Sequence, residues 1–148
     1  MRINLWYLAL IVASFCLGYW NARTSYDEPI VFVDTKEEAI RRAKRDTEIS
    51  VAGKNYVVFT RTDSMRPYIL PEASFVSFDK TPFSELKVHD IITFFSPRNP
   101  SEMIIHFVHE KLPNGNIRTK GSNNPAPDPW EVTEEHYIAK VKTIFTAK

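Results

Sequence analysis

Residues 102–120 read EMIIHFVHEKLPNGNIRTK, and this stretch indicates the fold class most clearly. Two runs rich in β-branched, aromatic and other apolar residues flank Asn114-Gly115, which is the strongest hairpin signal in the sequence. Along the first run, the alternation of a strand would point His106 to one face and His109 to the other. The stretch therefore predicts two antiparallel strands, the first of which carries two histidines.

Runs of the same kind continue on both sides of this stretch. The chain has ten prolines and four glycines, and together with asparagines they separate the runs, which favours many short strands joined by irregular loops. No internal repeat or low-complexity tract is visible in the sequence. We therefore expect a mainly β fold, with further strands in NYVVFTRT (55–62), ASFVSFD (73–79), DIITFF (90–95) and HYIAKVKTIF (136–145).

Residues 36–47, KEEAIRRAKRDT, predict a short helix ahead of these strands. Asp34 and Glu37 form a capping-box pattern at its start. The basic residues of the helix could contact anionic lipid headgroups, or they could belong to a solvated face, which the acidic residues beside them favour. The basic residues are Arg41, Arg42, Lys44 and Arg45, and the acidic ones are Glu37, Glu38 and Asp46.

Length and composition narrow the class of protein. The chain of 148 residues has room for one modest domain, because single domains commonly contain about 100–200 residues. Nineteen Lys and Arg against 18 Asp and Glu give a formal charge of +1, which argues against nucleic-acid binding through overall basicity. A single cysteine excludes an internal disulfide, and no Cys/His cluster has zinc spacing. The sequence indicates no metal, no organic cofactor and no nucleic-acid partner.

The N-terminal segment predicts a membrane anchor. Ile3 to Trp20 is 18 residues without a charge, and a helix of that length spans roughly 27 Å, close to the hydrocarbon core of a bilayer. Aromatic residues near both ends are typical of membrane interfaces. A cleaved signal peptide is the competing interpretation, but it needs small residues at the cleavage site, and Trp20 precedes Asn21-Ala22. We expect an uncleaved transmembrane helix.

The charges beside this segment predict its orientation. Arg2 and the α-amino group lie before it, and Arg23 after it is soon followed by Asp27 and Glu28, so the positive-inside rule favours an N-terminus in the cytoplasm. The chain would then be a single-pass membrane protein whose β domain lies on the extracytoplasmic side. The expected organisation is a transmembrane anchor over residues 1–22, a juxtamembrane segment with a short helix over residues 23–54, and a β domain over residues 55–148.

Three places concentrate side chains that could do chemistry. Ser64 follows a predicted strand, where its hydroxyl can face a cleft. His106 lies within another predicted strand, and TKGSNN (119–124) and Asp128 lie in a segment rich in Asn and Pro. Each place alone has an ordinary interpretation, namely a serine in a turn, a packed or exposed histidine, and a polar loop.

Together and in this order, these places resemble the type I signal peptidase family, in its archaeal and endoplasmic-reticulum branch. TDSMRP (62–67) resembles the family's S-M-x-P nucleophile box, and IIHFV (104–108) is similar to the I-V-H-R-V box of that branch. TKGSNN followed by Asp128 resembles T-K-G-D-N-N followed by a nearby Asp. VHDIITF (88–94) and YIAKV (137–141) resemble the G-D-I-V-x-F and I-x-G-K/R-V strands of the family.

The resemblance implies a membrane-bound serine endopeptidase that removes N-terminal signal peptides from exported proteins. Ser64 corresponds to the nucleophile, and His106 corresponds to the general base, where the bacterial branch has a lysine. Asp128 corresponds to the acidic residue that supports the histidine. The backbone N–H of Ser64 and the hydroxyl of Thr62 correspond to the oxyanion hole. The implied fold is a partly open, mainly β barrel with small helices, tethered by one N-terminal transmembrane helix.

The resemblance also implies the partners and leaves alternatives open. The family's substrates carry small residues at positions −1 and −3 of the cut and bind as an extended strand, and the lipid bilayer is the other expected partner. Four positions depart from the pattern: Ser122 replaces Asp, Phe107 replaces Arg, His89 replaces Gly, and Asp63 stands where Gly is common. Either the Ser122 hydroxyl makes a structural hydrogen bond, or a supporting carboxylate is lost.

Three other functions compete with signal peptide removal. One is a non-catalytic membrane-tethered module that binds leader peptides or a partner subunit, and Ser122, Asp63 and Phe107 point that way. Another is a specialised processing peptidase of the same fold. A soluble, self-cleaving Ser-Lys repressor is disfavoured by the predicted anchor and by the absence of a lysine at position 106.

Overall fold

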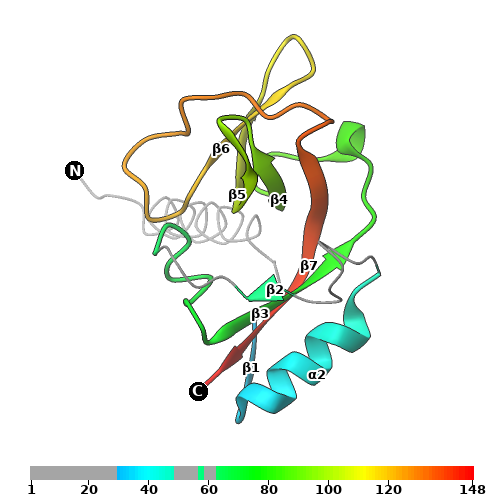
Figure 1. Cartoon of the computed structure of the whole chain (residues 1–148), viewed down its shortest axis with the longest axis vertical. Helices are drawn as coiled ribbons and strands as arrows, with labels where there is room; N and C mark the ends of the chain where they lie inside the picture. Colours follow the sequence, from blue (N-terminus) through cyan, green and yellow to red (C-terminus); the bar gives the residue numbers. More distant parts are fainter. Residues whose placement is uncertain (1–29, 49–56, 59–62) are drawn as a thin grey trace, which may run out of the picture.

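The computed structural model describes residues 30–48, 57–58 and 63–148. These residues form a mainly β fold built on one open sheet, which confirms the expected fold class at this level (Figure 1). The helical elements among them are α2 (Lys36–Asp46) and a 3₁₀ turn (Phe83–Glu85). The strands are β1 (Ile30–Val33), β2 (Val57–Val58), β3 (Ser74–Asp79), β4 (Ile91–Ser96), β5 (Asn99–Lys111), β6 (Ile117–Lys120) and β7 (Tyr137–Ala147).

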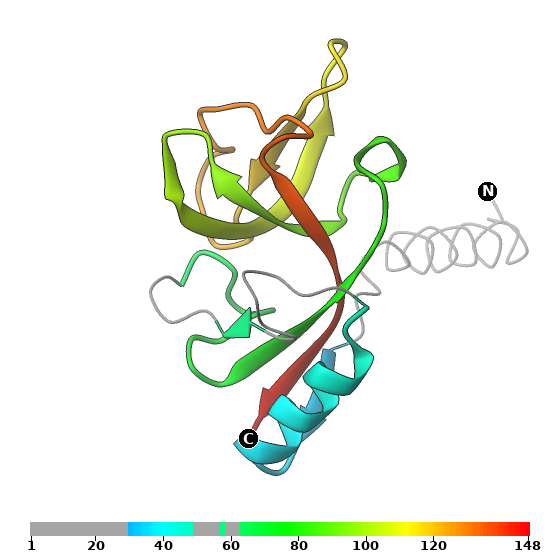
Figure 2. The same cartoon turned by 45° about the vertical axis from the view of Figure 1, so that its right-hand side comes forward.

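The long strand β7 joins the two halves of the sheet. The strand order is β2-β3-β7-β4-β5-β6, and β1 pairs in parallel with the end of β7. β3 pairs with β7 between Lys140 and Thr146, whereas β4 pairs with β7 between Tyr137 and Lys140. A register shift interrupts each of these two pairings, which lets the sheet bend. Figure 2 shows β7 running from the end that holds β4 and β5 to the end that holds α2.

The hairpin predicted at Asn114-Gly115 is confirmed. β5 and β6 pair antiparallel from Phe107–Lys111 to Ile117–Lys120. Gly115 has φ +86°, the left-handed conformation that glycine adopts without a Cβ clash, and its N–H donates to the carbonyl of Leu112 over 3.0 Å. The turn therefore requires glycine at this position, and it fixes the register of the strand that carries His106.

The tip of this hairpin is tied to the loop that follows β6. The side-chain amides of Asn116 and Asn114 each donate to the carboxylate of Glu131 over 2.9 Å, and these bonds hold the pKa of that carboxyl below its ordinary value. The backbones of Ile117 and Val132 also exchange two hydrogen bonds, of 3.0 and 2.8 Å. The loop containing residues 121–130 is therefore fastened at both ends.

The predicted helix is confirmed as α2, but its cap differs from the expected one. Thr35, not Asp34, is the N-cap: its backbone is extended and its hydroxyl accepts the N–H of Glu38 over 3.1 Å. The expected pattern was one residue out of register, because Thr35 and Glu38 have the same spacing as Asp34 and Glu37. The buried Ala39 packs with Phe75 and Phe145 of the sheet.

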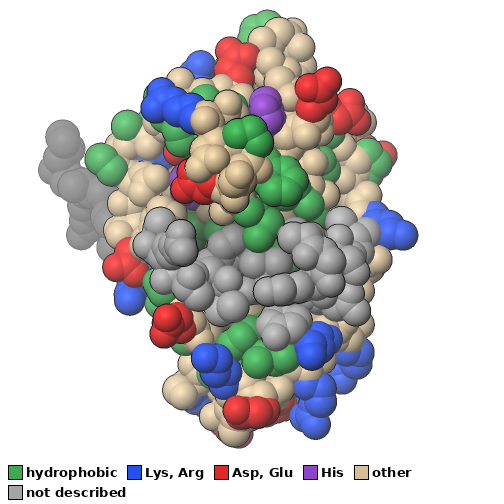
Figure 3. Space-filling view, viewed as in Figure 1, with side chains coloured by type: hydrophobic (Ala, Val, Ile, Leu, Met, Phe, Trp, Pro, Cys, Tyr) green, Lys and Arg blue, Asp and Glu red, His purple; other side chains and the backbone are tan. Residues whose placement is uncertain are grey.

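The outer face of α2 is basic. Arg41, Lys44 and Arg45 are exposed, and Figure 3 shows Lys and Arg side chains gathered over this end of the molecule. Arg42 instead forms an ion pair with Glu38 along the helix, with 2.6 Å between its Nη2 and Oε1. Contact of this face with lipid headgroups stays a prediction.

Apolar side chains of β5 alternate between two clusters of the core. Ile105 and Phe107 pack in one cluster, whereas Val108 packs in the other together with Phe94. The ring of His106 lies 6.4 Å from the ring of Phe94, between centroids, so that it shares the side of Val108. The alternation predicted from the sequence thus sets the direction of the histidine.

The expected membrane anchor, residues 1–22, lies outside the described residues, as does most of the strand expected at residues 55–62. Within the part of the chain that the structure describes, no helix has the length and apolarity needed to cross a membrane. The sequence did not predict β1, which adds a parallel strand to the end of β7.

Substitution of two adjacent phenylalanines of β4 tests which face of this strand is buried in the core. Phe94 is fully buried, so Phe94→Ala is expected to lower the free energy of unfolding by about 3–5 kcal/mol. Phe95 is 38% exposed, and Phe95→Ala is expected to cost less than about 1 kcal/mol. Urea unfolding of the full-length chain, followed by tryptophan fluorescence, measures both values. Equal losses would contradict this assignment.

Candidate active site

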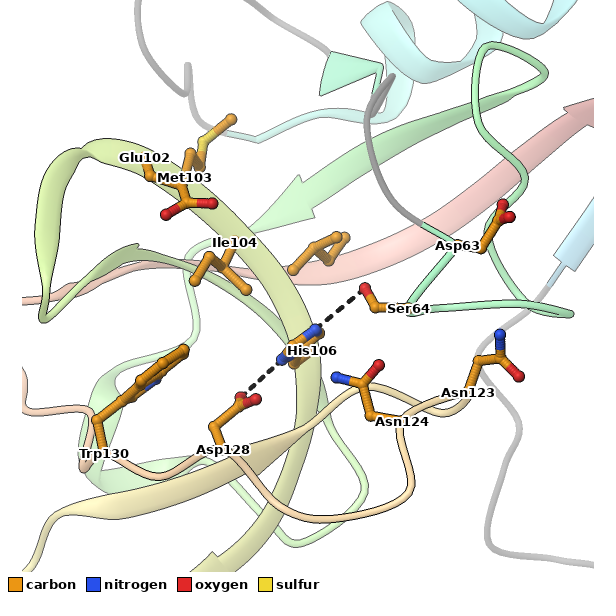
Figure 4. A pocket seen from close by; sticks show the side chains of 11 residues that line it. Asp63, Ser64, Glu102, Met103, Ile104, His106, Asn123, Asn124, Asp128 and Trp130 are labelled. Atoms are coloured by element: carbon orange, nitrogen blue, oxygen red, sulfur yellow. Dashed lines mark hydrogen bonds and ion pairs between the residues drawn. The ribbon is translucent and has the colours of Figure 1, made fainter.

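Ser64, His106 and Asp128 form a hydrogen-bonded series. Nε2 of His106 lies 3.1 Å from Oγ of Ser64, and Nδ1 of the same ring lies 2.6 Å from Oδ2 of Asp128 (Figure 4). Ser64 lies in a turn ahead of β3, His106 lies in β5, and Asp128 lies in the loop between β6 and β7. These three residues lie far apart in the sequence. The structure brings them together, and they are the three that the sequence analysis selected.

Asp128 is held in place by β6. Its backbone N–H donates to the carbonyl of Thr119 over 2.8 Å, and the Thr119 hydroxyl donates to Oδ2 of Asp128 over 2.6 Å. Asp128 and His106 are each 6% exposed, and a carboxylate buried to this extent is costly unless its oxygens accept hydrogen bonds. Because the carboxylate only accepts, Nδ1 of His106 carries the hydrogen, and Nε2 is left to accept the Ser64 proton.

The turn that carries Ser64 is fixed by core packing and by a backbone hydrogen bond. Met65 is 2% exposed and packs in the same core cluster as Ile105 and Phe107. The N–H of Asn123 donates to the carbonyl of Ser64 over 2.8 Å. These contacts hold the serine hydroxyl toward the imidazole.

Ser122 fastens the same turn through its side chain. Its hydroxyl donates to the carbonyl of Arg66 over 2.8 Å. Of the two alternatives raised by the replacement of Asp, the structure therefore supports the one in which the hydroxyl makes a structural hydrogen bond. An ionised carboxylate at this position would meet the carbonyl as a second acceptor and would be repelled.

Gly121 lies where no side chain fits. A Cβ on this residue would be 2.7 Å from the carbonyl oxygen of Ser64 and 2.9 Å from Nε2 of His106. Side-chain carbons do not approach backbone or ring atoms this closely in folded proteins, because the contact is strongly repulsive. The glycine therefore allows the loop after β6 to lie directly against both residues.

Two other carboxylates near the site, Asp63 and Asp90, have partners of their own. Oδ1 of Asp63 pairs with Nε of Arg66 over 2.7 Å, and in Figure 4 its carboxylate points away from His106. Oδ1 of Asp90 pairs with Nζ of Lys140 over 2.9 Å. The negative charge that Asp63 adds next to the predicted nucleophile is thus balanced by a neighbouring arginine.

The second histidine of β5 and the residue after His106 do not join the series. Phe107 is 8% exposed and packs edge-on against Tyr68, with 5.2 Å between ring centroids. His109 is exposed at a register shift between β5 and β6. His106 contacts Ser64 and His109 lies on the other face of the strand, as the alternation predicts for the two histidines, and Phe107 packs in the core.

The three residues open into a cleft of about 520 Å³. Its walls are the first half of β5, residues 102–105, and the segment that contains Ser64 and residues 123–124 (Figure 4). β4 pairs with residues 103–107 of β5, but β6 begins to pair with β5 only at Phe107. Among the strands that the structure describes, residues 103–105 therefore have a partner on one side only, so that an open sheet edge borders the cleft.

The remaining predicted site residue, Thr62, lies outside the described residues. No group of three or more His, Cys, Asp or Glu that could hold a metal ion occurs in the described ranges. The side chains in contact are a hydroxyl, an imidazole and a buried carboxylate, the combination that activates a serine for acyl transfer.

Sequence reasoning assigned no role to two residues that the geometry makes important, Thr119 and Gly121. Both belong to TKGSNN, whose loop-forming composition and resemblance to T-K-G-D-N-N gave neither residue a role of its own. The alternation of β6 offers a signal for Thr119, because it shares a face with the apolar Ile117, and both are fully buried. The close contact of Gly121 depends on a segment 57 positions earlier, at Ser64, and no local pattern encodes it.

Comparison of the chain with protein-family models, with curated proteins and with solved structures found no match.

The contact at Gly121 can be tested without an activity assay. Gly121→Ala is expected to displace the imidazole of His106, because the added Cβ collides with Nε2, and the ring ¹⁵N resonances of His106 should shift. Gly115→Ala is the matched control: nothing lies within 4 Å of its Cβ, so it should cost about 1 kcal/mol through its positive φ and leave those resonances in place. Unchanged His106 resonances in Gly121→Ala would contradict the contact.

Proposed function

We propose that this chain is a membrane-bound serine endopeptidase of the signal peptidase type, which removes N-terminal signal peptides from exported proteins. One observation carries the proposal: Ser64, His106 and Asp128 are hydrogen-bonded in series, in a cleft bordered by an open strand edge. A serine hydroxyl is a poor nucleophile unless an adjacent base takes its proton, and an imidazole oriented by a carboxylate is such a base.

The proposed reaction uses these three side chains in turn. Oγ of Ser64 attacks the scissile carbonyl while its proton moves to Nε2 of His106, and Asp128 stabilises the imidazolium. The imidazolium then protonates the leaving amine, which is the new N-terminus of the mature protein, as the C–N bond breaks. Water attacks the acyl group on Ser64 and gives a proton to Nε2 of His106. The imidazolium returns that proton to Oγ of Ser64 as the ester bond breaks, which releases the signal peptide with a free carboxylate and restores the enzyme. The Ser64 N–H and the Thr62 hydroxyl are the proposed donors to the oxyanion.

The open edge of β5 supports binding of the substrate as an extended strand. A peptide aligned with residues 102–105 would gain main-chain hydrogen bonds there, which is the usual source of affinity in strand addition. Met103, Ile104 and Ile105 line this part of the cleft and offer it apolar side chains. Such a surface fits the small residues that we propose at positions −1 and −3 of the signal peptide.

The proposal extends to the parts of the chain outside the described residues. Within it, residues 1–22 are a single transmembrane anchor, and the β domain is a partly open barrel at the extracytoplasmic surface of the membrane. Tethering would hold the cleft near the bilayer, where the apolar segment of a signal peptide resides. No cofactor is assigned to the reaction.

The packing around the site also bears on the non-catalytic alternative. The replacements that suggested a leader-binding module have structural explanations, because Ser122 donates a hydrogen bond, Phe107 packs in the core and Asp63 pairs with Arg66. A specialised processing peptidase of the same fold would use the same three residues. Only its substrate would differ, so substrate profiling separates the two.

Cleavage of a preprotein with an A-x-A site by the detergent-solubilised chain tests the proposal. The wild-type protein should cut at that site, while Ser64→Ala and His106→Ala should lose activity by about 10⁶-fold, because the nucleophile and its base act as a unit. Asp128→Ala should lose about 10⁴-fold with its fold intact, because the imidazole would lose its orientation.

Two matched controls change the same residue types away from the cleft. Ser84→Ala alters an exposed serine in the 3₁₀ turn, and Asp34→Ala alters an exposed aspartate ahead of α2, and both should cleave at the wild-type rate. Undiminished cleavage by Ser64→Ala would reject the proposed nucleophile. A folded wild-type protein that binds the preprotein without cutting it would reject the enzyme and favour the leader-binding module.

A further inference from the structure

A second cleft, of about 480 Å³, lies on the other side of Gly121 and Ser122 from the catalytic cleft. Gly121 lines the second cleft and lies directly against Ser64 and His106 through the close contact described above, so this cleft adjoins the residues that line the catalytic one. The walls of the second cleft come from the turn after Ser64, the turn before β4, the second half of β5 and the end of β6.

The second cleft is lined by one cationic side chain and by hydrogen-bond donors. His89, His109 and Lys120 contribute their side chains, and no Asp or Glu is among the described residues that line it. A lysine ammonium is a point charge with three donors, and a neutral imidazole still donates one N–H. Asp90, the acidic residue next to His89, is engaged by Lys140 over 2.9 Å. The cleft is therefore suited to a carboxylate.

His89 carries a conformational cost at this position. Its φ is +78°, in the left-handed region that a side chain with a Cβ adopts at a cost, and its N–H donates to the carbonyl of Val108 over 2.8 Å. A glycine would adopt the same backbone without that cost. Backbone strain that a simpler residue would relieve is a sign of a functional side chain, and the His89 side chain lines the cleft.

We propose that the second cleft binds acidic side chains in the first residues of the mature protein, on the C-terminal side of the scissile bond. This inference rests on the proposed function. The direction follows from the two linings: the catalytic cleft offers Met103, Ile104 and Ile105 to the signal peptide, whereas the second cleft offers one cationic side chain and hydrogen-bond donors. Tyr68 and Phe107 form an aromatic wall that would cover the aliphatic part of a Glu or Asp side chain.

Two preproteins with the same A-x-A site, one with Glu and one with Gln at positions +1 to +3, test the inference. The detergent-solubilised wild-type chain should cleave the Glu substrate with a kcat/KM roughly tenfold higher, because hydrogen bonds to charged groups are worth more than neutral ones. The ratio of the two kcat/KM values should fall toward one in Lys120→Gln. It should also decrease with added salt, since partly exposed charges are screened.

His89→Gly and Lys148→Gln are the informative comparisons. His89→Gly removes the imidazole and relieves the positive φ, so it should reduce the Glu-over-Gln ratio without lowering the melting temperature, which separates binding from folding. Lys148→Gln removes the same charge as Lys120→Gln at the far end of β7 and should keep the wild-type ratio.

The outcomes distinguish the inference from the function on which it rests. Equal cleavage of the Glu and Gln substrates by the wild-type protein would overturn the inference and leave the peptidase intact. An unchanged ratio in both Lys120→Gln and His89→Gly would overturn it as well. No cleavage of either substrate by the folded protein would overturn the proposed function, and the inference would fall with it.

Discussion

The buried carboxylate of Asp128 is the constraint on which the site depends. With 6% of its surface exposed, it is stable as an anion only where donors meet it, and both His106 and Thr119 contact Oδ2 over 2.6 Å. Those donors come from two neighbouring strands, so β5 and β6 must pair in the observed register. The turn at Gly115 sets that register, and the loop after β6 must fold back to bring the carboxylate between them.

Close packing of the loop after β6 then fixes the position of Ser64 relative to His106 and Asp128. Gly121 allows the loop after β6 to lie on the serine turn, and the hydrogen bonds from Asn123 and Ser122 lock the two segments together. From the other side, Met65 anchors the turn in the core. The same loop separates the two clefts, one with an apolar strand edge and one with a cationic side chain and hydrogen-bond donors. We infer that a substrate crossing Ser64 would meet different chemistry before and after the scissile bond.

Much of this fold could be predicted from the sequence, because its strands are runs of β-branched and aromatic residues and its hairpin has a distinctive turn. The alternation of β5 predicted that His106 and His109 would lie on opposite faces, and the family resemblance predicted that His106 would be the partner of Ser64. The path from Asn124 to Trp130 could not be predicted, since it depends on backbone bonds to Thr119 and Ile117 across the loop. The contact at Gly121 and the parallel pairing of β1 could not be predicted either, because each depends on a partner far away in the sequence.

The central claim is that Ser64, activated by His106, carries the acyl group of the substrate. Rapid acid quench of the full-length protein during cleavage of a preprotein, followed by intact-mass and peptide-mapping mass spectrometry, tests it directly. The account predicts a transient adduct with the mass of the signal peptide acyl group, attached to the peptide that contains Ser64. Cleavage that proceeds with no adduct under single-turnover conditions, or with an adduct on another residue, would contradict it.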